Sequence, residues 1–322
     1  MTVACQEVYS ILTEEGVITP TRVLVGRTNS GAHVQSTAQQ MFAELFNKGL
    51  MLWIDELLRY EAADDGLLTL LRKVLTICAE QSHKPNPNKC SFYLREALWR
   101  GRVITGDGVR HDPARSTALS NLPQPAKGQG LKQFVCAFNW MRASLLAFNK
   151  LVNPLVKMME RVYDRAGGRK KTQVRAVKLC DVGWGDDEST CIERCKAALQ
   201  HALMLAHPDP DKLLSVYCDA SDEHWGAAIT QIPRDHAARP LSEQEHQPLM
   251  MLSGSFSGTA KRWTIVEKEA YAIVETCRRA DYLLHRPNGF ALFTDHRNLR
   301  YIFDPHSVSK SVPKYTADKL HR

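Results

Sequence analysis

Two short segments in the last third of the chain share one design: alternating apolar residues that end on an aspartate. In the first, Leu214, Val216 and Cys218 alternate before Asp219; the second, GFALFTDH, ends on Asp295. Strict alternation of apolar and polar residues predicts a strand with one buried face. A chain with two such strands has to build a sheet, and we expect both aspartates where the backbone leaves that sheet.

An amphipathic pattern between the two segments predicts a helix over residues 263–284. Its apolar stripe consists of Val266, Ala270, Ile273, Val274 and Cys277. Glu269 flanks this stripe on one side, one turn from residues 266 and 273, and Glu267 flanks it equally well on the other. Periodicity alone therefore leaves both glutamates open as groups that face the strand ends.

The rest of the chain mixes helical and strand patterns. Helices are expected at 34–46, 67–80, 131–155 and 188–206, a hairpin within 92–108, and strands at 213–219, 224–231, 249–255 and 290–295. A basic stretch from Arg161 to Lys178 surrounds a Gly-Gly pair and is expected to be a linker or an exposed loop. This order of elements predicts an α/β and α+β multidomain chain.

Bulk composition restricts the class of protein only loosely. The 322 residues suffice for two or three domains, and the net charge of +7 with a pI near 8.9 gives a mild preference for polyanions. The nine cysteines are scattered, and the sequence starts without a secretory pattern and contains no apolar run that could cross a bilayer. We expect a soluble intracellular protein of the cytoplasm or nucleus, with no membrane partner.

Asp219, Glu269 and Asp295 have the residue types that a magnesium site requires. Hydrolysis of a phosphodiester needs an activated water and charge relief on the leaving oxygen, and two Mg²⁺ ions about 4 Å apart supply both. Carboxylates are ligands that Mg²⁺ prefers, and the cation offsets the repulsion between them. Taken singly, each acid has an ordinary explanation, because aspartates often cap turns and helical glutamates are often solvated. A site for two Mg²⁺ ions therefore requires the three acids jointly.

Three motifs carry a resemblance to a known family: CDASDEHWGAAI at 218–229, SGSFSGTAKRWTIVEKEAYAIV at 253–274 and FTDHRNL at 293–299. In order, spacing and residue type they resemble the ribonuclease H domain attached to the reverse transcriptase of gypsy-class LTR retrotransposons. The resemblance implies a ribonuclease H-like mixed sheet with helices that cleaves RNA in RNA–DNA hybrids. It also implies that Asp219, Glu269 and Asp295 are catalytic and bind the metals, which favours Glu269 over Glu267.

The resemblance extends upstream over nearly the whole chain. ESTCIERCKAALQHAL with HPDPDKLLSVYCDAS resembles the segment that joins polymerase to nuclease, and NPNKCSFYLREALWRGRVITGDGVRHDP resembles the hairpin that holds the primer terminus. TPTRVLVGRTNSGAHVQSTAQQMF resembles the fingers-to-palm segment that contacts nucleotide and template, whose characteristic positions fall on Gly26, Arg27, Thr28, Asn29 and Gln35. The basic residues Arg169, Lys170 and Lys171 suit a nucleic-acid backbone, or they form only a solvated linker.

The segment LMLWIDELL lies where the family carries an aromatic-x-Asp-Asp turn between two strands. Trp53 and Asp55 fit this motif, and Glu56 replaces the second aspartate, which moves the carboxylate by about a bond length. The resemblance implies that Asp55 and Glu56 are catalytic and that Asp55 binds metal. The chain also begins after the family's first palm aspartate and ends before its fourth nuclease carboxylate, so we expect a fragment of a pol polyprotein. The alternative is a catalytically inactive remnant that still binds nucleic acid.

The resemblance divides the chain into three expected parts. These are a partial reverse transcriptase fingers and palm at 1–106, a helical thumb or connection with the basic linker at 107–181, and an incomplete ribonuclease H-like domain at 182–322. The expected partners are an RNA–DNA hybrid or a DNA/RNA template-primer and the rest of a pol polyprotein. Cys191 and Cys195, with His201 nearby, have zinc-like spacing, but a helix core explains them better. His296 is a proton shuttle or an ordinary turn histidine.

Overall fold

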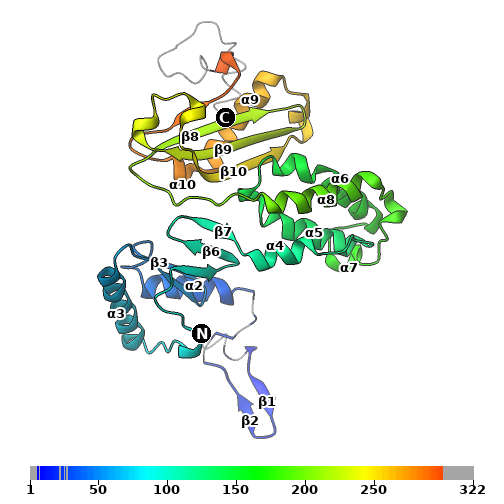
Figure 1. Cartoon of the computed structure of the whole chain (residues 1–322). Helices are drawn as coiled ribbons and strands as arrows, with labels where there is room; N and C mark the ends of the chain where they lie inside the picture. Colours follow the sequence, from blue (N-terminus) through cyan, green and yellow to red (C-terminus); the bar gives the residue numbers. More distant parts are fainter. Residues whose placement is uncertain (1–5, 7, 22, 25, 27, 300–322) are drawn as a thin grey trace. The chain divides into compact units, whose positions relative to one another are not determined.

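The computed structural model describes residues 6, 8–21, 23, 24, 26 and 28–299, and the chain divides into two compact units, Met1–Leu94 and Arg95–Arg322 (Figure 1). One apolar core lies in the first unit and two lie in the second. The prediction of a mixed α/β chain is confirmed. Among the described helices, none combines the length and the apolarity that crossing a bilayer needs.

Among its described residues, the first unit contains two hairpins and the helices α2 (Ser30–Met41) and α3 (Asp64–Glu80). Strands β1 (Ile11–Thr13) and β2 (Gly16–Ile18) pair antiparallel, as do β3 (Leu50–Trp53) and β4 (Glu56–Arg59). Helices α2 and α3 occur where apolar periodicity predicted helices, and a short turn η1 (Pro87–Lys89) follows. The core consists mainly of Phe42, Leu45, Leu50, Leu52, Leu70, Val74 and Cys78. Every fourth residue of α3 from Leu70 to Cys78 faces this core, as the helical period requires.

The second unit begins with a three-stranded antiparallel sheet. Its strands are β5 (Glu96–Trp99), β6 (Arg102–Thr105) and β7 (Val109–His111). Arg100 and Gly101 connect β5 to β6, and both have positive φ, which is the backbone of a two-residue hairpin turn. The expected domain boundary at residue 106 falls between β6 and β7 of this sheet, and the three-part division stays a prediction.

A helical cluster follows the three-stranded sheet. It contains α4 (Pro113–Ser120), α5 (Gly128–Asn139), η2 (Arg142–Ser144), α6 (Phe148–Ala166), α7 (Lys171–Val174), η3 (Cys180–Val182) and α8 (Asp186–Gln200). The single helix expected at 131–155 is in fact two, because the chain leaves helical geometry after Asn139 and Ala147 has a left-handed φ of 49°. Cys191 and Cys195 are buried in the core of this cluster, as preferred over a zinc site.

The basic stretch 161–178 is not a free linker. It comprises the last turn of α6, a Gly167 cap with φ 64°, and α7. Val162 and Val174 from this stretch are fully buried in the helical cluster, while its basic side chains face solvent. Composition suggested a loop because the stretch is mainly basic. The two valines that anchor it are isolated among the charged residues and give no periodic apolar pattern.

The second core belongs to a mixed four-stranded sheet with strand order β10-β9-β8-β11. Strands β8 (Leu213–Ala220), β9 (His224–Ile232) and β10 (Gln247–Ser255) form an antiparallel meander, and β11 (Ala291–Phe293) pairs parallel to β8. Helix α9 (Ile265–Arg279) packs on β8 and β9 and is followed by α10 (Asp281–Leu284) (Figure 1). The expected strands and the helix over 263–284 are confirmed, apart from the break between α9 and α10.

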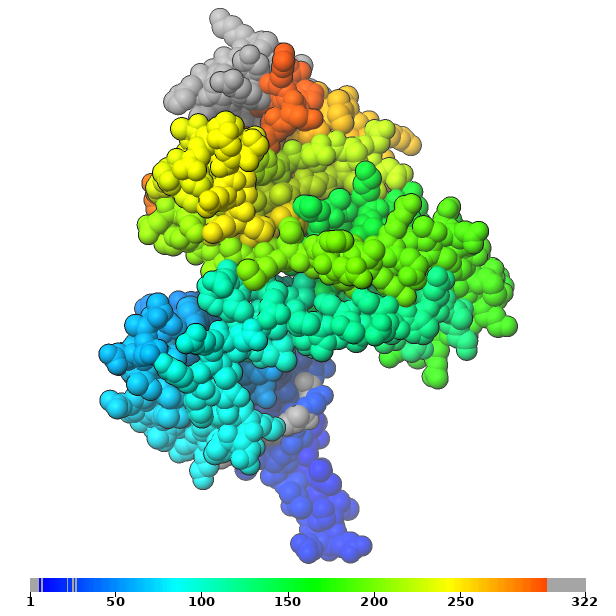
Figure 2. Space-filling model, viewed as in Figure 1, coloured from blue at the N-terminus to red at the C-terminus, as the bar shows by residue number. Residues whose placement is uncertain are grey.

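The helical cluster covers the outer strand β10 of this sheet. The Arg142 guanidinium donates to the Ser253 carbonyl over 3.0 Å, and the Asn149 main-chain N–H donates to the Ser253 hydroxyl over 3.1 Å. The space-filling view shows the cluster in contact with the sheet (Figure 2). An uncovered edge strand exposes backbone polar groups that can pair with another chain, and the helical cluster covers this edge. The sheet and the cluster belong to one compact unit.

Candidate metal centre

The two aspartates that end the alternating segments come from neighbouring parallel strands. The last pair in the β8–β11 ladder is Tyr217 with Phe293. Two residues further in the same register, Asp295 lies level with Asp219, at the carboxyl ends of both strands. Cys218 and Ala220 on either side of Asp219 are buried, so the pleat turns the Asp219 side chain to the exposed face of the strand.

The third acid comes from helix α9, whose start is fixed by a capping box. The Thr264 hydroxyl accepts a hydrogen bond from the Glu267 main-chain N–H over 3.4 Å, and the Glu267 carboxylate accepts one from the Thr264 N–H over 2.9 Å. Glu267 is therefore used in starting the helix. Glu269, two residues on, turns toward the sheet and is only 4% exposed. This geometry separates two glutamates that periodicity could not distinguish.

Asp219, Glu269 and Asp295 meet at one place. Each offers a carboxylate oxygen, and these oxygens lie within 4.8 Å of one another. Within the part of the chain that the structure describes, this is the single group of three or more potential metal ligands. The Ala220 main-chain N–H donates to Glu269 Oε1 over 3.1 Å, whereas Glu269 Oε2 is buried and has no hydrogen-bond partner among the described residues.

The electrostatics of the cluster oppose three bare carboxylates. The pKa of Glu269 is raised to about 7, chiefly by burial and also by the nearby Asp219 and Asp295, against the hydrogen bond from Ala220, which lowers it. A buried acceptor without a partner and a carboxyl whose charge is disfavoured are both relieved by a cation. The donor set consists of hard carboxylate oxygens, so the residues fit the predicted magnesium.

Two polar contacts beside these acids were not predicted from the sequence. One is the hydrogen bond from Ala220 to Glu269, which joins main chain to side chain and leaves no sequence signature. The other is an ion pair between Lys268 of α9 and Asp222 of the β8–β9 turn. A lysine directly before the predicted ligand Glu269 was visible in the sequence, but its burial was not.

The predicted polymerase motif forms a tight hairpin turn in the first unit. Trp53 pairs with Glu56, so Ile54 and Asp55 make the two-residue turn, and Ile54 has a positive φ of 55°. Asp55 and Glu56 are both exposed. Among the described residues, neither joins a group of three or more potential metal ligands. The strand–turn–strand shape agrees with the predicted motif, and the catalytic role of the two acids stays a prediction.

Gln35, predicted to contact nucleotide or template, lies on α2 and binds this hairpin. Its Oε1 accepts from the Ile54 N–H over 2.6 Å, and its Nε2 donates to the Leu52 carbonyl over 3.4 Å. Gln35 thus links α2 to the turn that presents Asp55. A structural role for its amide is evident, and binding of nucleotide stays a prediction.

The other predicted nucleotide-binding residues lie just before α2. Gly26 has a positive φ of 94°, a conformation that glycine adopts without strain, and Asn29 immediately precedes the first residue of α2. Thr28 is exposed beside it. Arg27 lies outside the described residues. These positions are close in sequence, and their role stays a prediction.

The basic residues predicted to contact a nucleic-acid backbone are exposed on the helical cluster. Arg169 pairs with Glu160 at 2.9 Å and stacks over Tyr163, with 72% of its side chain exposed. Lys170 and Lys171 are exposed at the start of α7. They form a solvated surface on a folded element, which is compatible with phosphate binding but does not require it.

His296 follows the predicted ligand Asp295 and is half-buried. Its main-chain N–H donates to the Thr294 hydroxyl over 3.3 Å, which is a turn contact. Its Nδ1 is buried without a hydrogen-bond partner among the described residues. Both readings of this histidine, turn residue and proton shuttle, therefore stay open.

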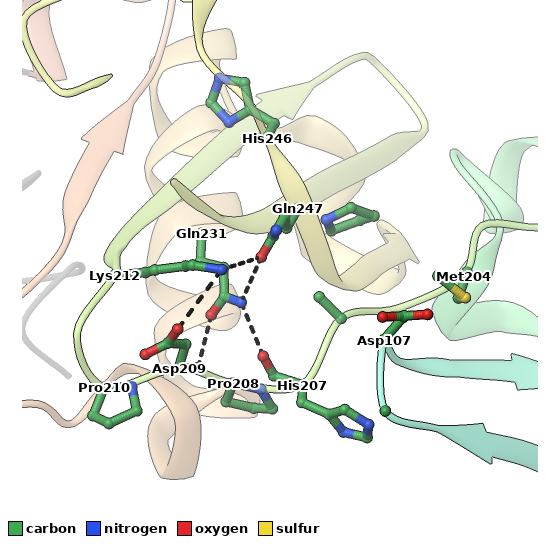
Figure 3. Close-up of a pocket in the computed structure, with 13 residues that line it drawn as sticks. Asp107, Met204, His207, Pro208, Asp209, Pro210, Lys212, Gln231, His246 and Gln247 are labelled. Carbon is green, nitrogen blue, oxygen red and sulfur yellow. Dashed lines mark hydrogen bonds and ion pairs between the residues drawn. The ribbon is translucent and has the colours of Figure 1, made fainter. Parts of the chain in front are cut away.

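A cavity of about 660 Å³ lies apart from the three acids, none of which lines it (Figure 3). Its floor is the buried Gln231, whose Nε2 donates to the His207 carbonyl over 2.9 Å and to Gln247 Oε1 over 3.0 Å, and whose Oε1 accepts from the Asp209 N–H. Lys212 donates to the same Gln247 oxygen over 2.8 Å. These groups bind one another, and the network fixes the connection that leads into β8.

Comparisons with known proteins agree with this fold. Residues 209–321 match the family model described as the RNase H-like domain found in reverse transcriptase. The chain is similar to the retrovirus-related Pol polyproteins of two Drosophila melanogaster transposons, 297 (23% identical over 87% of this chain) and gypsy (18% identical over 91%). It spans about a quarter of the length of the curated relatives that it matches.

Solved structures of the foamy viral protease-reverse transcriptase have a similar fold. The structure in complex with RNA/DNA hybrid has a TM-score of 0.73 and 18% identity, covering 99% of this chain and 40% of that one. The structure in complex with dsDNA has a TM-score of 0.75 and 18% identity, covering 99% of this chain and 61% of that one. At this identity the likeness shows the fold alone.

The second unit therefore contains an RNase H-like domain of the type found in reverse transcriptase. The predicted resemblance to gypsy-class retrotransposons is confirmed, and the chain is similar to a part of retrotransposon Pol polyproteins.

Proposed function

We propose that this chain is the reverse transcriptase–ribonuclease H portion of a retroelement Pol polyprotein, and that its RNase H-like domain hydrolyses the RNA strand of RNA–DNA hybrids. The observation that carries the proposal is the meeting of Asp219, Glu269 and Asp295 within 4.8 Å. The partially buried set of like charges is unfavourable alone and suits divalent cations.

The three acids would hold two Mg²⁺ ions, which supply an activated water and charge relief on the leaving oxygen when bound. Glu269 is the fixed ligand, because its Oε1 is held by Ala220 and its carboxylate is buried. Asp219 and Asp295 are exposed, so a substrate in solution could approach the metals on their side. The ladder between β8 and β11 ends two residues before each of these acids and would position them for phosphoryl transfer, which depends on positioning.

The remaining parts of the chain fit the same proposal. Residues 1–106 would be a partial fingers and palm, with Asp55 and Glu56 at the polymerase turn. Its nucleotide- and template-binding positions would be Gly26, Arg27, Thr28, Asn29 and Gln35. The helical cluster would be a thumb or connection that contacts the phosphate backbone through Arg169, Lys170 and Lys171. The partners would be a hybrid or template-primer duplex and the remainder of the polyprotein. The foamy viral protease-reverse transcriptase structures of similar fold are complexes with RNA/DNA hybrid and with dsDNA, which supports the choice of ligand.

Cleavage of a labelled RNA–DNA hybrid by the full 322-residue chain tests the nuclease proposal. We expect cleavage of the RNA strand that requires Mg²⁺ and that Asp219→Asn reduces at least a hundredfold. Asp222 adjoins the site, so Asp222→Asn is not a suitable control. Asp235 is an exposed acid beyond β9, and Asp235→Asn, the matched control, should retain the wild-type rate. Equal cleavage by wild-type and Asp219→Asn chains would contradict the proposal.

The alternative is an inactive remnant that binds nucleic acid through its basic surface. It predicts that the chain binds hybrid with an affinity that falls steeply with salt, without cleaving it. Replacing Arg169, Lys170 and Lys171 with alanine would then weaken binding and reduce its salt dependence. Binding without cleavage at any Mg²⁺ concentration would favour this second function.

A further inference from the structure

A buried lysine adjoins the predicted metal ligand Glu269. The Lys268 side chain is only 4% exposed, and its ammonium donates to Asp222 Oδ1 over 3.2 Å. The ammonium also lies 5.7 Å from the centre of the Phe256 ring, and Phe256 is itself buried. Lys268 is thus enclosed by α9, by the residue after β10 and by the β8–β9 turn.

Stability alone does not favour this placement. Lys268 is the fourth residue of α9, near the positive end of the helix dipole, where a cation is disfavoured. Burying an ammonium also carries a desolvation penalty that an ion pair with a fully solvated partner offsets poorly, and 98% of the Asp222 side chain is exposed. An apolar side chain of similar length would serve the core better. The lysine therefore suggests a role other than stability.

Its partner lies in the turn that follows Asp219. Asp222 belongs to the short connection between β8 and β9, which is closed by a hydrogen bond of 2.7 Å from the Ser221 N–H to the His224 carbonyl. Two consecutive residues of α9 thus hold this connection: Glu269 accepts from the Ala220 N–H, and Lys268 donates to Asp222. The two contacts lie one and three residues after Asp219 and fix how close its carboxylate can lie to that of Glu269.

We propose that Lys268 and Asp222 are positioning residues that hold the β8–β9 turn against α9, and so keep Asp219 and Glu269 at the separation that divalent metal binding requires. This inference rests on the proposed metal centre. It adds the contacts that hold the carboxylates of Asp219 and Glu269 close together before the metal binds. Contacts outside the ligands commonly change metal affinity tenfold or more. The pair acts through the turn, and neither residue is itself a ligand.

The turn offers a matched control on its other side. The Lys157 ammonium of α6 pairs with Glu223, the next residue of the same turn, at 3.3 Å. Both side chains of that pair are more than half exposed, so the contact is solvated and contributes little. A Lys157→Met substitution removes an ammonium–carboxylate contact to the same turn without touching α9.

Titration of the full chain with Mn²⁺, followed by calorimetry, tests the inference without relying on cleavage. We expect Lys268→Met and Asp222→Ala to weaken Mn²⁺ binding about tenfold or more. Asp222→Glu keeps the carboxylate and should stay within threefold of wild type, as should Lys157→Met. Thermal unfolding without metal should show Lys268→Met at least as stable as wild type, because an apolar side chain replaces a buried charge.

The outcomes separate this inference from the proposed function. Wild-type Mn²⁺ affinity in both Lys268→Met and Asp222→Ala would overturn the positioning role, even if the chain cleaves hybrid. A loss of Mn²⁺ affinity in Lys157→Met as large as that in Lys268→Met would also overturn the positioning role. The same holds if Mn²⁺ binding by the chain does not depend on Asp219. Weakened binding in the two variants of a chain that cleaves no hybrid would retain the positioning role and reject the hydrolysis.

Discussion

The main-chain N–H of Ala220 donates a hydrogen bond of 3.1 Å to Oε1 of Glu269, across 49 residues of sequence. This bond commits one oxygen of the buried carboxylate to the strand and leaves Oε2 without a partner among the described residues. Because Ala220 directly follows Asp219, the bond also brings the two acids together. The neighbouring Glu267, by contrast, is used in capping the helix.

The two glutamates of α9 therefore give opposite predictions. Glu269→Gln should reduce Mg²⁺-dependent cleavage of hybrid at least a hundredfold, because it removes the charge of the fixed ligand. Glu267→Gln should retain wild-type cleavage within about threefold, because glutamine also completes a capping box. Steady-state cleavage rates at saturating Mg²⁺ measure both. Loss of activity in Glu267→Gln at unchanged thermal stability would show that the ligand is misassigned.

The buried His111 predicts a pH-dependent stability. Burial, and then the neighbouring Arg102, lower the pKa of His111 from 6.5 to about 4, while the Met141 carbonyl acts in the opposite direction. The unfolded chain takes up this proton near pH 6.5, but the folded chain does so only near pH 4. The stability that His111 contributes is therefore complete above pH 6.5 and is lost as the pH falls from 6.5 through 4. Urea unfolding at pH 7 and pH 4.5 should show a smaller loss in His111→Leu than in wild type.

Arg102 provides an independent check of that cause. Because Arg102 lowers the pKa of His111, Arg102→Met should raise that pKa toward its ordinary value. The loss of stability between pH 7 and pH 4.5 should then be intermediate between those of wild type and His111→Leu. A loss equal to that of wild type in both variants would assign the pH dependence to other groups.

The sequence predicts the sheet and its acids well, for a physical reason. Alternation around Val216 and the same pattern before Asp295 are local signals of a half-buried strand, and the parallel ladder then brings their ends together. The Glu267 and Glu269 ambiguity could also have been resolved locally, since Thr264 three residues before Glu267 is the signature of a capping box.

Other features depend on contacts that no local pattern encodes. Lys268 is buried only because Asp222, 46 residues earlier, and the Phe256 ring lie beside it. The basic stretch that looked like a linker is packed because Val174 reaches the core of the helical cluster. In both cases one side chain decides the structure, and its partner is distant in sequence.

Replacing Gln35 should reduce the protection of the β3–β4 turn against hydrogen exchange. Its Oε1 accepts from the Ile54 N–H over 2.6 Å, and Ile54, a β-branched residue with positive φ, adopts a strained conformation. Gln35→Leu leaves that N–H without its acceptor, at a cost of about 1–3 kcal/mol. Hydrogen exchange should then accelerate at the Ile54 amide by at least tenfold. Gln40→Leu, at an exposed position of the same helix, should leave it unchanged, and equal acceleration in both would attribute the effect to the helix.

At Gly254 the four-stranded sheet of the second unit is expected to tolerate no side chain. Gly254 pairs with Trp225 across β10 and β9, and a Cβ at Gly254 would overlap the buried indole. The ring cannot yield, because Trp225 is 3% exposed and lies against Tyr271 and Arg279. Gly254→Ala should therefore lower the free energy of unfolding by about 1–3 kcal/mol through overpacking.

Gly226→Ala, whose Cβ would meet only the Leu252 carbonyl at 3.9 Å, is the control and should change the free energy of unfolding much less. Urea unfolding monitored by tryptophan fluorescence compares the two, and equal losses would place the constraint in the backbone of the sheet rather than in the fixed ring of Trp225.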